Sequence, residues 1–325
     1  MIETLAAIWR RLLKQPSIGI NDNFFDLGGN PAQAVELFSE ISRAYGRQLP
    51  PVMIYQAPTI RELAYLLTDS SSPRECPALV LMKPGNVGTP IFLAPGMGGD
   101  ALQLFHLVKH LNVGAPVYVL QAHGIDGLSE PLDCIEEMAD RYTQTIESVQ
   151  PQGPYFLIGY SLGGLIMMEI AQRVFSRGQK IGLLAMIDSY PYRSYLSLDQ
   201  QFPLAVRAVV RRIYSLRKLL RRPNQQPPLS STGELHARIY SGAMTAWKRY
   251  RPRSYSGKIN FLRAETVSYF PKNVRAVWGH LVEVLEVRTL PGDHGALVNR
   301  HSKEVTDVLT TLLPDTFLQN RVDLS

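Results

Sequence analysis

From Ala78 onward the chain alternates short apolar runs with amphipathic segments, and this alternation restricts the possible folds more than any other feature. Seven runs have the length and composition of buried strands: ALVLM, PIFLAP, PVYVLQ, YFLIGY, IGLLAMID, KINFLRAE and LEVRTL. Segments with helical spacing lie between them, including residues 136–150, 164–177 and 302–313. A β-α-β order predicts a doubly wound α/β domain with a mostly parallel sheet. Chemistry is then expected beyond the carboxyl ends of the strands.

The first 68 residues have a different pattern, which is typical of helices and loops. Helices are predicted at 3–13, 32–45 and 59–67, and the last begins with the Thr59–Glu62 capping-box pair. Residues 69–77 open with the polar sequence DSSSPRE, which is typical of a solvated linker. The predicted organisation is therefore a helical bundle at 1–68, a linker at 69–77 and an α/β domain at 78–325.

Composition excludes several classes of protein. No apolar stretch in the 325 residues is long enough to cross a membrane, so a membrane association is not expected and a cytoplasmic protein is predicted. Cys76 and Cys134 are too few for a disulfide framework and show no metal-ligand spacing, so no metal site is predicted. A net charge of +6 does not by itself indicate nucleic-acid binding.

The strongest chemical motif is GYSLG at 159–163, which places Ser161 between an apolar strand at 155–158 and a helix at 163–175. The five-residue pattern alone is common, but this strand-turn-helix setting is what a nucleophile elbow requires. The small glycines allow the sharp turn, which exposes the serine hydroxyl above the sheet. The alternative is a glycine-rich turn without chemistry.

A nucleophilic serine needs a base downstream, and His294 is the best-placed histidine. It lies in the sequence PGDHG, directly after the last strand-like run, where flanking glycines allow a loop to return over the sheet. Surface or packing roles are expected for the other six histidines, which are His106, His110, His123, His236, His280 and His301. Ser161 and His294 are therefore predicted as nucleophile and base.

Two carboxylates compete for the role of orienting the imidazole. Asp188 ends the run at 181–187, and Glu265 ends the run at 259–264, so the pattern alone leaves the choice open.

An oxyanion hole requires two backbone donors. The N–H of Leu162 is one candidate. The glycine-rich loop PGMGG at 95–99 offers Gly96 as the other, with Met97 as the second choice. A phosphate-binding loop is the competing interpretation, but no Gly-Lys-Ser/Thr sequence follows.

Together these residues resemble the carrier protein plus type I thioesterase didomain at the C-terminus of nonribosomal peptide synthetases. The loop at Pro95, the elbow GYSLGG, the run AMIDSYP, the segments YRP and FLRA, and GDH at 292–294 occur in the order of that family. The resemblance implies an α/β-hydrolase domain preceded by a small, all-α, four-helix carrier-like bundle. It also implies that Asp188, rather than Glu265, is the acid of the triad.

In the first domain, DNFFDLGGN at 22–30 resembles the carrier motif, in which the next residue is a serine that carries phosphopantetheine. This sequence has Pro31 there, and proline has no hydroxyl group to modify. Proline is favourable in the first turn of a helix, so we expect the fold to form without the attachment chemistry. Three explanations are open. The domain is a degenerate carrier kept for docking or solubility, or Pro31 is a variant or engineered position, or the function never used the arm.

About 70 residues separate Asp188 from the strand at Lys258, which is long for a connection, and the resemblance implies a lid at about 190–256. A helix is predicted from Pro203, with an apolar stripe on one face and a basic face opposite. Seven basic residues lie between Val206 and Pro223: Arg207, Arg211, Arg212, Arg217, Lys218, Arg221 and Arg222. A solvated face is the simpler interpretation, and attraction of a carrier, an anionic substrate or a membrane surface is the alternative.

The resemblance implies a thioesterase that releases an acyl or peptidyl group from a phosphopantetheine thioester through a Ser161 acyl-enzyme. Hydrolysis, cyclisation and condensation with a carbon nucleophile remain open, and the thioesterase itself is expected to bind no cofactor. Upstream adenylation or condensation modules are the implied partners, and a partner's carrier or a soluble thioester supplies the acyl group. A stand-alone lipid esterase with the same triad and an inactive docking module are the alternatives.

Overall fold

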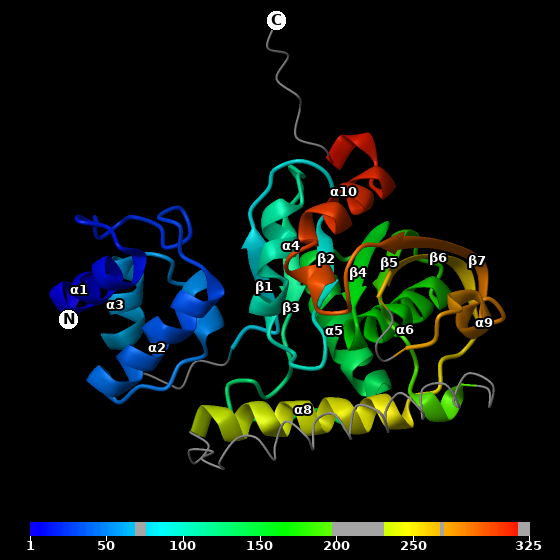
Figure 1. Cartoon of the computed structure of the whole chain (residues 1–325), viewed down its shortest axis with the longest axis horizontal. Helices are drawn as coiled ribbons and strands as arrows, with labels where there is room; N and C mark the ends of the chain where they lie inside the picture. Colours follow the sequence, from blue (N-terminus) through cyan, green and yellow to red (C-terminus); the bar gives the residue numbers. More distant parts are fainter. Residues whose placement is uncertain (69–75, 197–230, 267–269, 318–325) are drawn as a thin grey trace, which may run out of the picture.

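The computed structural model describes residues 1–68, 76–196, 231–266 and 270–317 (Figure 1). The first domain contains three α-helices and a short 3-10 helix: α1 (Ile2–Leu13), α2 (Pro31–Tyr45), η1 (Pro51–Tyr55) and α3 (Ile60–Thr68). The helices predicted at 3–13, 32–45 and 59–67 are confirmed to within one residue at each end. The implied four-helix bundle is matched only if η1 is counted as its fourth helix.

Side-chain caps define where the helices of the first domain begin. Asn30 precedes α2, where it and Gln33 form a capping box with two hydrogen bonds of 3.1 Å. Pro31 occupies the first turn of α2, where backbone N–H groups have no acceptor within the helix, so the N–H that proline lacks costs no hydrogen bond. The predicted capping box of α3 is also present, because the Glu62 N–H donates to Thr59 Oγ1 at 3.2 Å and the Thr59 N–H donates to Glu62 Oε2 at 3.1 Å.

The second domain is built on a seven-stranded sheet in the order β1-β3-β2-β4-β5-β6-β7. Its strands are β1 (Leu79–Lys83), β2 (Ile91–Ala94), β3 (Val117–Leu120), β4 (Tyr155–Tyr160), β5 (Ile181–Ile187), β6 (Tyr255–Ala264) and β7 (Val282–Leu290). Only β1 is antiparallel to its neighbour, and the other five pairs are parallel. The predicted mostly parallel sheet is confirmed, and each of the seven predicted runs overlaps one strand, although β1, β6 and β7 extend beyond their runs.

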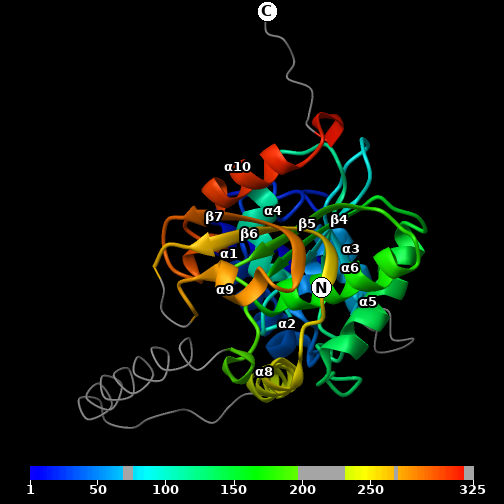
Figure 2. The ribbon, with the colours of Figure 1, turned by 90° about the vertical axis from the view of Figure 1, so that its right-hand side faces the viewer.

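Helices cover both faces of this sheet, as a doubly wound domain requires. One face packs against α4 (Phe105–His110) and α10 (Ser302–Leu312). The other packs against α5 (Ile135–Val149), α6 (Leu162–Ser176) and α9 (Val274–Trp278). Figure 2 shows the sheet between these two helical layers. The carboxyl ends of the parallel strands meet at one edge of this sandwich, where the predicted site residues lie.

Within the predicted lid at about 190–256, the structure describes residues 190–196, which contain the short 3-10 helix η3 (Arg193–Tyr195), and residues 231–256. The second of these segments begins with the helix α8 (Ser231–Arg249), which runs along one side of the second domain (Figure 1). Ala243, Ala246 and the following Tyr250 are buried in the core that contains α5 and α6. The helix predicted from Pro203 and the seven basic residues between 206 and 223 lie outside the described residues. The interpretation of the basic segment therefore stays a prediction.

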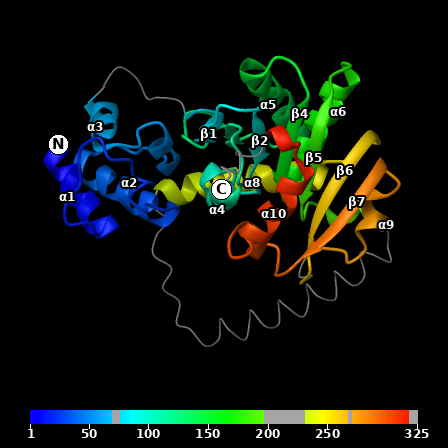
Figure 3. The same cartoon turned by 90° about the horizontal axis from the view of Figure 1, so that it is seen from above.

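The two domains lie side by side (Figure 3). A small aromatic contact joins them. Phe25, from the carrier-like motif, stacks on Tyr55 of η1 with ring centroids 4.4 Å apart, and it contacts Phe105 of α4 at 5.6 Å. Val52 of η1 is 2% exposed and belongs to the apolar core of the second domain. Burial, reinforced by the nearby Asp100 carboxylate, raises the pKa of Tyr55. The first domain thus packs directly on the segment at 100–105.

Candidate active site

Three predicted side chains form one hydrogen-bonded line at the carboxyl ends of β4, β5 and β7. His294 Nε2 lies 3.0 Å from Ser161 Oγ, and His294 Nδ1 lies 2.9 Å from Asp188 Oδ2. The Ala264 N–H donates to the second oxygen of Asp188 at 3.1 Å. An imidazole that donates through Nδ1 presents Nε2 as an acceptor for the serine proton. The arrangement can therefore activate the hydroxyl group of Ser161.

The backbone around Ser161 explains why glycines flank it. The backbone of Ser161 has a φ of 56°, a value that residues other than glycine rarely adopt, and it leads directly into α6. A β-carbon at Gly159 would lie 2.3 Å from the carbonyl oxygen of Gly163, and one at Gly163 would lie 2.2 Å from the carbonyl oxygen of Ala94. Only glycine fits at these two positions, because the strand, the turn and the helix pack backbone against backbone.

The two candidate acids occupy different environments. Asp188 is 4% exposed, and its left-handed backbone, with a φ of 48°, turns the chain out of β5 below His294. Glu265 is exposed beyond β6, and its carboxylate makes no hydrogen bond with any described residue. The structure therefore brings Asp188, and not Glu265, to the imidazole.

The Gly96–Met97 loop also lies beside the nucleophile. A β-carbon on Gly96 would be 3.3 Å from Ser161 Cβ, so this backbone passes directly over the elbow. The Gly96 N–H, however, donates to Gln103 Oε1 at 2.7 Å. Within the described residues, the N–H groups of Met97 and Leu162 have no acceptor. Met97, the second choice from the sequence, thus keeps an available N–H beside the nucleophile, whereas Gly96 does not.

A cavity of about 440 Å³ opens over these residues. Ser161 and His294 lie in its lining, together with Gln103 and the ring-bearing side chains Tyr190, Tyr240, Trp247 and Phe270. This aromatic wall was not predicted from the sequence. A signal existed, because Tyr240, Met244 and Trp247 are spaced by four and three residues and so share one face of α8. The cavity suits a partly apolar substrate.

Aromatic rings also hold the imidazole in place. The ring of Tyr160 stacks on His294 with centroids 4.8 Å apart, and the Tyr160 hydroxyl donates to the His294 carbonyl oxygen at 3.1 Å. Phe270 contacts the imidazole at 5.2 Å between ring centroids. Burial raises the pKa of Tyr160 above its ordinary value, so this residue stays neutral and keeps its proton for that hydrogen bond.

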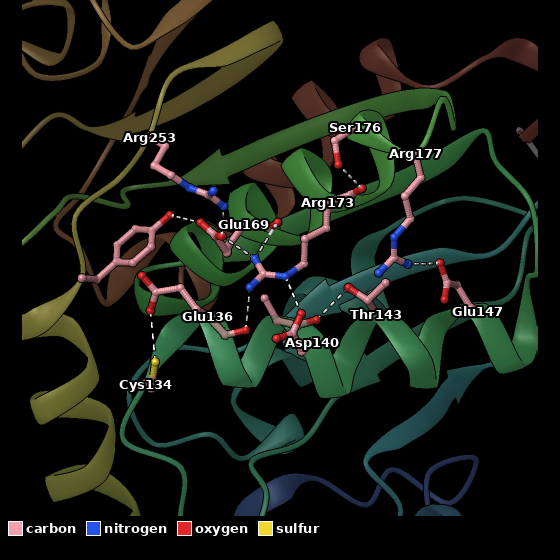
Figure 4. Close-up of polar contacts among 12 residues, drawn as sticks. Cys134, Glu136, Asp140, Thr143, Glu147, Glu169, Arg173, Ser176, Arg177 and Arg253 are labelled. Carbon is pink, nitrogen blue, oxygen red and sulfur yellow. Dashed lines mark hydrogen bonds and ion pairs between the residues drawn. The ribbon is translucent and has the colours of Figure 1, made fainter.

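A buried carboxylate ties α8 to the elbow helix (Figure 4). Glu169 of α6 is fully buried, and it accepts hydrogen bonds from the Tyr250 hydroxyl at 2.8 Å and from Arg253 Nη2 at 2.6 Å. Arg173 also pairs with Glu169, and its Nε donates to Asp140 Oδ1 at 2.6 Å. Because Tyr250 directly follows α8, this cluster fixes the end of the helix that lines the cavity.

Other predicted features of the chain are placed as follows. Burial raises the pKa of the Cys76 thiol to about 12, which makes it a poor nucleophile. Pro31 offers no nucleophilic atom, and the side chain of Asn30 is used in the capping box, so these residues do not fit a covalently attached phosphopantetheine.

Among the described residues, no cluster of His, Cys, Asp or Glu could hold a metal ion. No described helix has the length and hydrophobicity needed to cross a bilayer.

A family model for the thioesterase domain matches residues 89–313, which include the elbow, Asp188 and His294. The chain belongs to the thioesterase domain family. A second family model, for the phosphopantetheine attachment site, matches residues 3–67. The predicted pairing of a carrier-type domain with a thioesterase domain is therefore confirmed, and the carrier-type match lies within the predicted helical bundle.

Two larger synthases contain segments that are similar to this thioesterase. The dimodular nonribosomal peptide synthase of Bacillus subtilis (strain 168) is 35% identical over 189 residues, which cover 58% of this chain and 8% of that protein. The indigoidine synthase of Dickeya dadantii (strain 3937) is 37% identical over 182 residues, covering 56% of this chain and 12% of that protein. The thioesterase chain thus corresponds to a small part of the length of each relative.

Solved structures share the fold of this thioesterase. The crystal structure of holo-AB3403, a four-domain nonribosomal peptide synthetase bound to AMP and glycine, superposes with a TM-score of 0.62 at 24% identity, covering 96% of this chain and 26% of that chain. The NocB thioesterase domain, in covalent complex with a fluorophosphonate nocardicin G analog, gives a TM-score of 0.56 at 23% identity, covering 70% of this chain and 95% of that chain.

Proposed function

We propose that this chain releases an acyl or peptidyl group from a phosphopantetheine thioester through a covalent Ser161 acyl-enzyme. The hydrogen-bonded line of Ser161, His294 and Asp188, at the floor of a cavity walled by aromatic side chains, carries this proposal. Membership of the thioesterase domain family supports the thioester as the bond that is cleaved. The match of residues 3–67 to the phosphopantetheine attachment site supports a carrier-bound phosphopantetheine as the source of the acyl group.

The proposed reaction has two halves. Ser161 Oγ attacks the thioester carbonyl carbon while His294 Nε2 takes the serine proton, and the N–H groups of Met97 and Leu162 stabilise the oxyanion. The tetrahedral intermediate collapses, the carbon–sulfur bond breaks, and His294 returns the proton to the departing thiol. A nucleophile then attacks the acyl carbon and gives its proton to His294. The bond between this carbon and Ser161 Oγ breaks, and His294 passes the proton to the released serine oxygen. This nucleophile is water in hydrolysis, a hydroxyl or amine of the acyl chain in cyclisation, and a carbon nucleophile in condensation.

The decisive experiment is incubation with synthetic acyl- and peptidyl-pantetheine thioesters, followed by identification of the products by mass spectrometry. Turnover is expected, and the product mass distinguishes a hydrolysed acid from a ring or a condensed product. Cleavage of oxygen esters without any thioester turnover, together with binding to anionic vesicles, would instead indicate a lipid esterase. The absence of Ser161 labelling by a fluorophosphonate probe would indicate an inactive docking module, and Ser161→Ala is the control for both assays.

We further propose that the carrier-type domain of this chain does not carry its own substrate, because Pro31 replaces the nucleophilic hydroxyl group. Incubation with coenzyme A and a phosphopantetheinyl transferase is expected to leave the intact mass unchanged. Pro31→Ser is expected to restore the attachment position and to gain the mass of one phosphopantetheine, while Pro31→Ala gains none. A mass gain in the unaltered chain would contradict this proposal. If no phosphopantetheine is attached to this chain, the acyl group comes from a carrier on a partner protein or from a soluble thioester.

A further inference from the structure

Gln103 folds back over the loop that passes the nucleophile. It lies in the short 3-10 helix η2 (Ala101–Leu104), which Asp100 caps by accepting the Leu102 N–H at 2.8 Å. The Gln103 N–H donates to the Asp100 carbonyl oxygen at 3.1 Å, so the backbone of this turn is fixed. From there the side chain reaches Gly96, seven residues earlier in the chain, and accepts its N–H at 2.7 Å.

The orientation of the Gln103 carboxamide follows from its partner. A backbone N–H can only donate, so the atom that faces Gly96 has to be the oxygen Oε1. The amide nitrogen Nε2 then points elsewhere, and it has no acceptor within the part of the chain that the structure describes. Gln103 also belongs to the lining of the cavity that contains Ser161. The side chain therefore lies between the loop and the space where the acyl group binds.

Gly96 depends on this hydrogen bond. Its N–H has no other acceptor among the described residues, and glycine has no side chain that could fix the backbone by packing. The next peptide group, which carries the Met97 N–H, lies beside Ser161, because even a β-carbon on Gly96 would come within 3.3 Å of Ser161 Cβ. A rotation of the loop at Gly96 would therefore move the Met97 N–H away from the oxyanion.

We propose that Gln103 is a positioning residue, which binds the Gly96 N–H and thereby holds the Met97 N–H toward the oxyanion. This inference rests on the proposed function, because an oxyanion forms only if Ser161 attacks an acyl group. It also explains a distribution of roles within one loop: Gly96 is held by the protein, and Met97 is left for the substrate.

The kinetic test is Gln103→Met, which keeps the side-chain length and removes the acceptor. We expect kcat to fall about 10- to 100-fold with KM nearly unchanged, because the hydrogen bond from the Met97 N–H to the oxyanion, which the change weakens, forms only in the transition state. The thermal midpoint is expected to stay within a few degrees of the unaltered protein. Gln144→Met, at an exposed glutamine on α5, is the matched control and is expected to leave kcat unchanged. A raised KM with unchanged kcat would overturn the proposal and make Gln103 a substrate contact.

A second readout does not need turnover. Hydrogen exchange of the Gly96 amide, followed by NMR, is expected to accelerate about 5-fold or more in Gln103→Met, because one hydrogen bond is lost. Gln103→Glu keeps an acceptor at the same distance, so its Gly96 amide should stay protected. Equal exchange in the unaltered protein and in Gln103→Met would overturn the positioning role. If the unaltered protein exchanges slowly but turns over no thioester, then the proposed function fails while the hydrogen bond stands.

Discussion

Replacing Asp188 with asparagine is expected to lower kcat for thioester turnover by about 10⁴-fold. The structure explains why the change is severe. The Ala264 N–H binds Asp188 Oδ1 at 3.1 Å, so an asparagine in this place turns its only oxygen to Ala264 and its NH₂ group to His294 Nδ1. The imidazole then accepts at Nδ1 and carries its proton on Nε2. In that tautomer it cannot take the proton of Ser161.

Pre-steady-state kinetics with one acyl-pantetheine thioester would measure this loss, and Ser161→Ala would give the background rate. Glu265→Gln is the matched control, because Glu265 is the other strand-end carboxylate and is exposed without a described partner. We expect less than about a 2-fold change in kcat for this control, as for a surface substitution. A large loss in Glu265→Gln with near-normal activity in Asp188→Asn would assign the acid to Glu265.

Removal of the buried Glu169 carboxylate is expected to produce the largest loss of stability. In Glu169→Ala, the buried Tyr250 hydroxyl loses its 2.8 Å acceptor and Arg173 loses one of two carboxylate partners. Breaking a buried ion pair costs about 3–5 kcal/mol of unfolding free energy. We expect roughly 3 kcal/mol, at the lower end of that range, because Arg173 keeps its bond to Asp140.

Urea denaturation would measure this effect as a lower midpoint concentration of urea, while the slope of the unfolding free energy against urea concentration stays unchanged. Glu147→Ala is the matched control, since Glu147 of α5 also pairs with an arginine, Arg177 directly after α6, at 3.1 Å, but this pair is largely exposed, with side chains 31% and 56% accessible (Figure 4). This change is expected to cost less than about 1 kcal/mol. Similar losses in the two variants would mean that the buried cluster contributes no more than a surface pair.

Local patterns in the sequence were sufficient for most of the fold. Apolar runs and their spacing predicted all seven strands. The signal is strongest for β2 and β4, because a strand buried on both faces needs a continuous apolar segment, and it is weaker for the partly exposed edge strands β1 and β7. Ser161 and His294 could be predicted for a similar reason, since an elbow and a loop at a strand end each have a short, local pattern. Proline in the first turn of α2 was also correctly predicted, because its cost depends only on the neighbouring backbone.

The remaining features of the site depend on contacts between distant segments. Asp188 and Glu265 follow β5 and β6, which are neighbours in the sheet, so topology alone brings both carboxylates to the same edge. What separates them is the turn at Asp188 and the hydrogen bond from Ala264, neither of which has a sequence pattern. The same holds for Gln103, whose bond to Gly96 decides which N–H of the loop stays available.

The aromatic contact between the two domains is small, consisting mainly of Phe25, Val52 and Tyr55 against the surface around Phe105. Separate proteins that meet through so small a surface bind each other weakly. A short covalent connection changes this balance, because it holds one domain near the other at an effective concentration of about millimolar. The two halves, supplied as separate chains at micromolar concentration, would therefore stay mostly apart, whereas in one chain the same few side chains keep the contact formed.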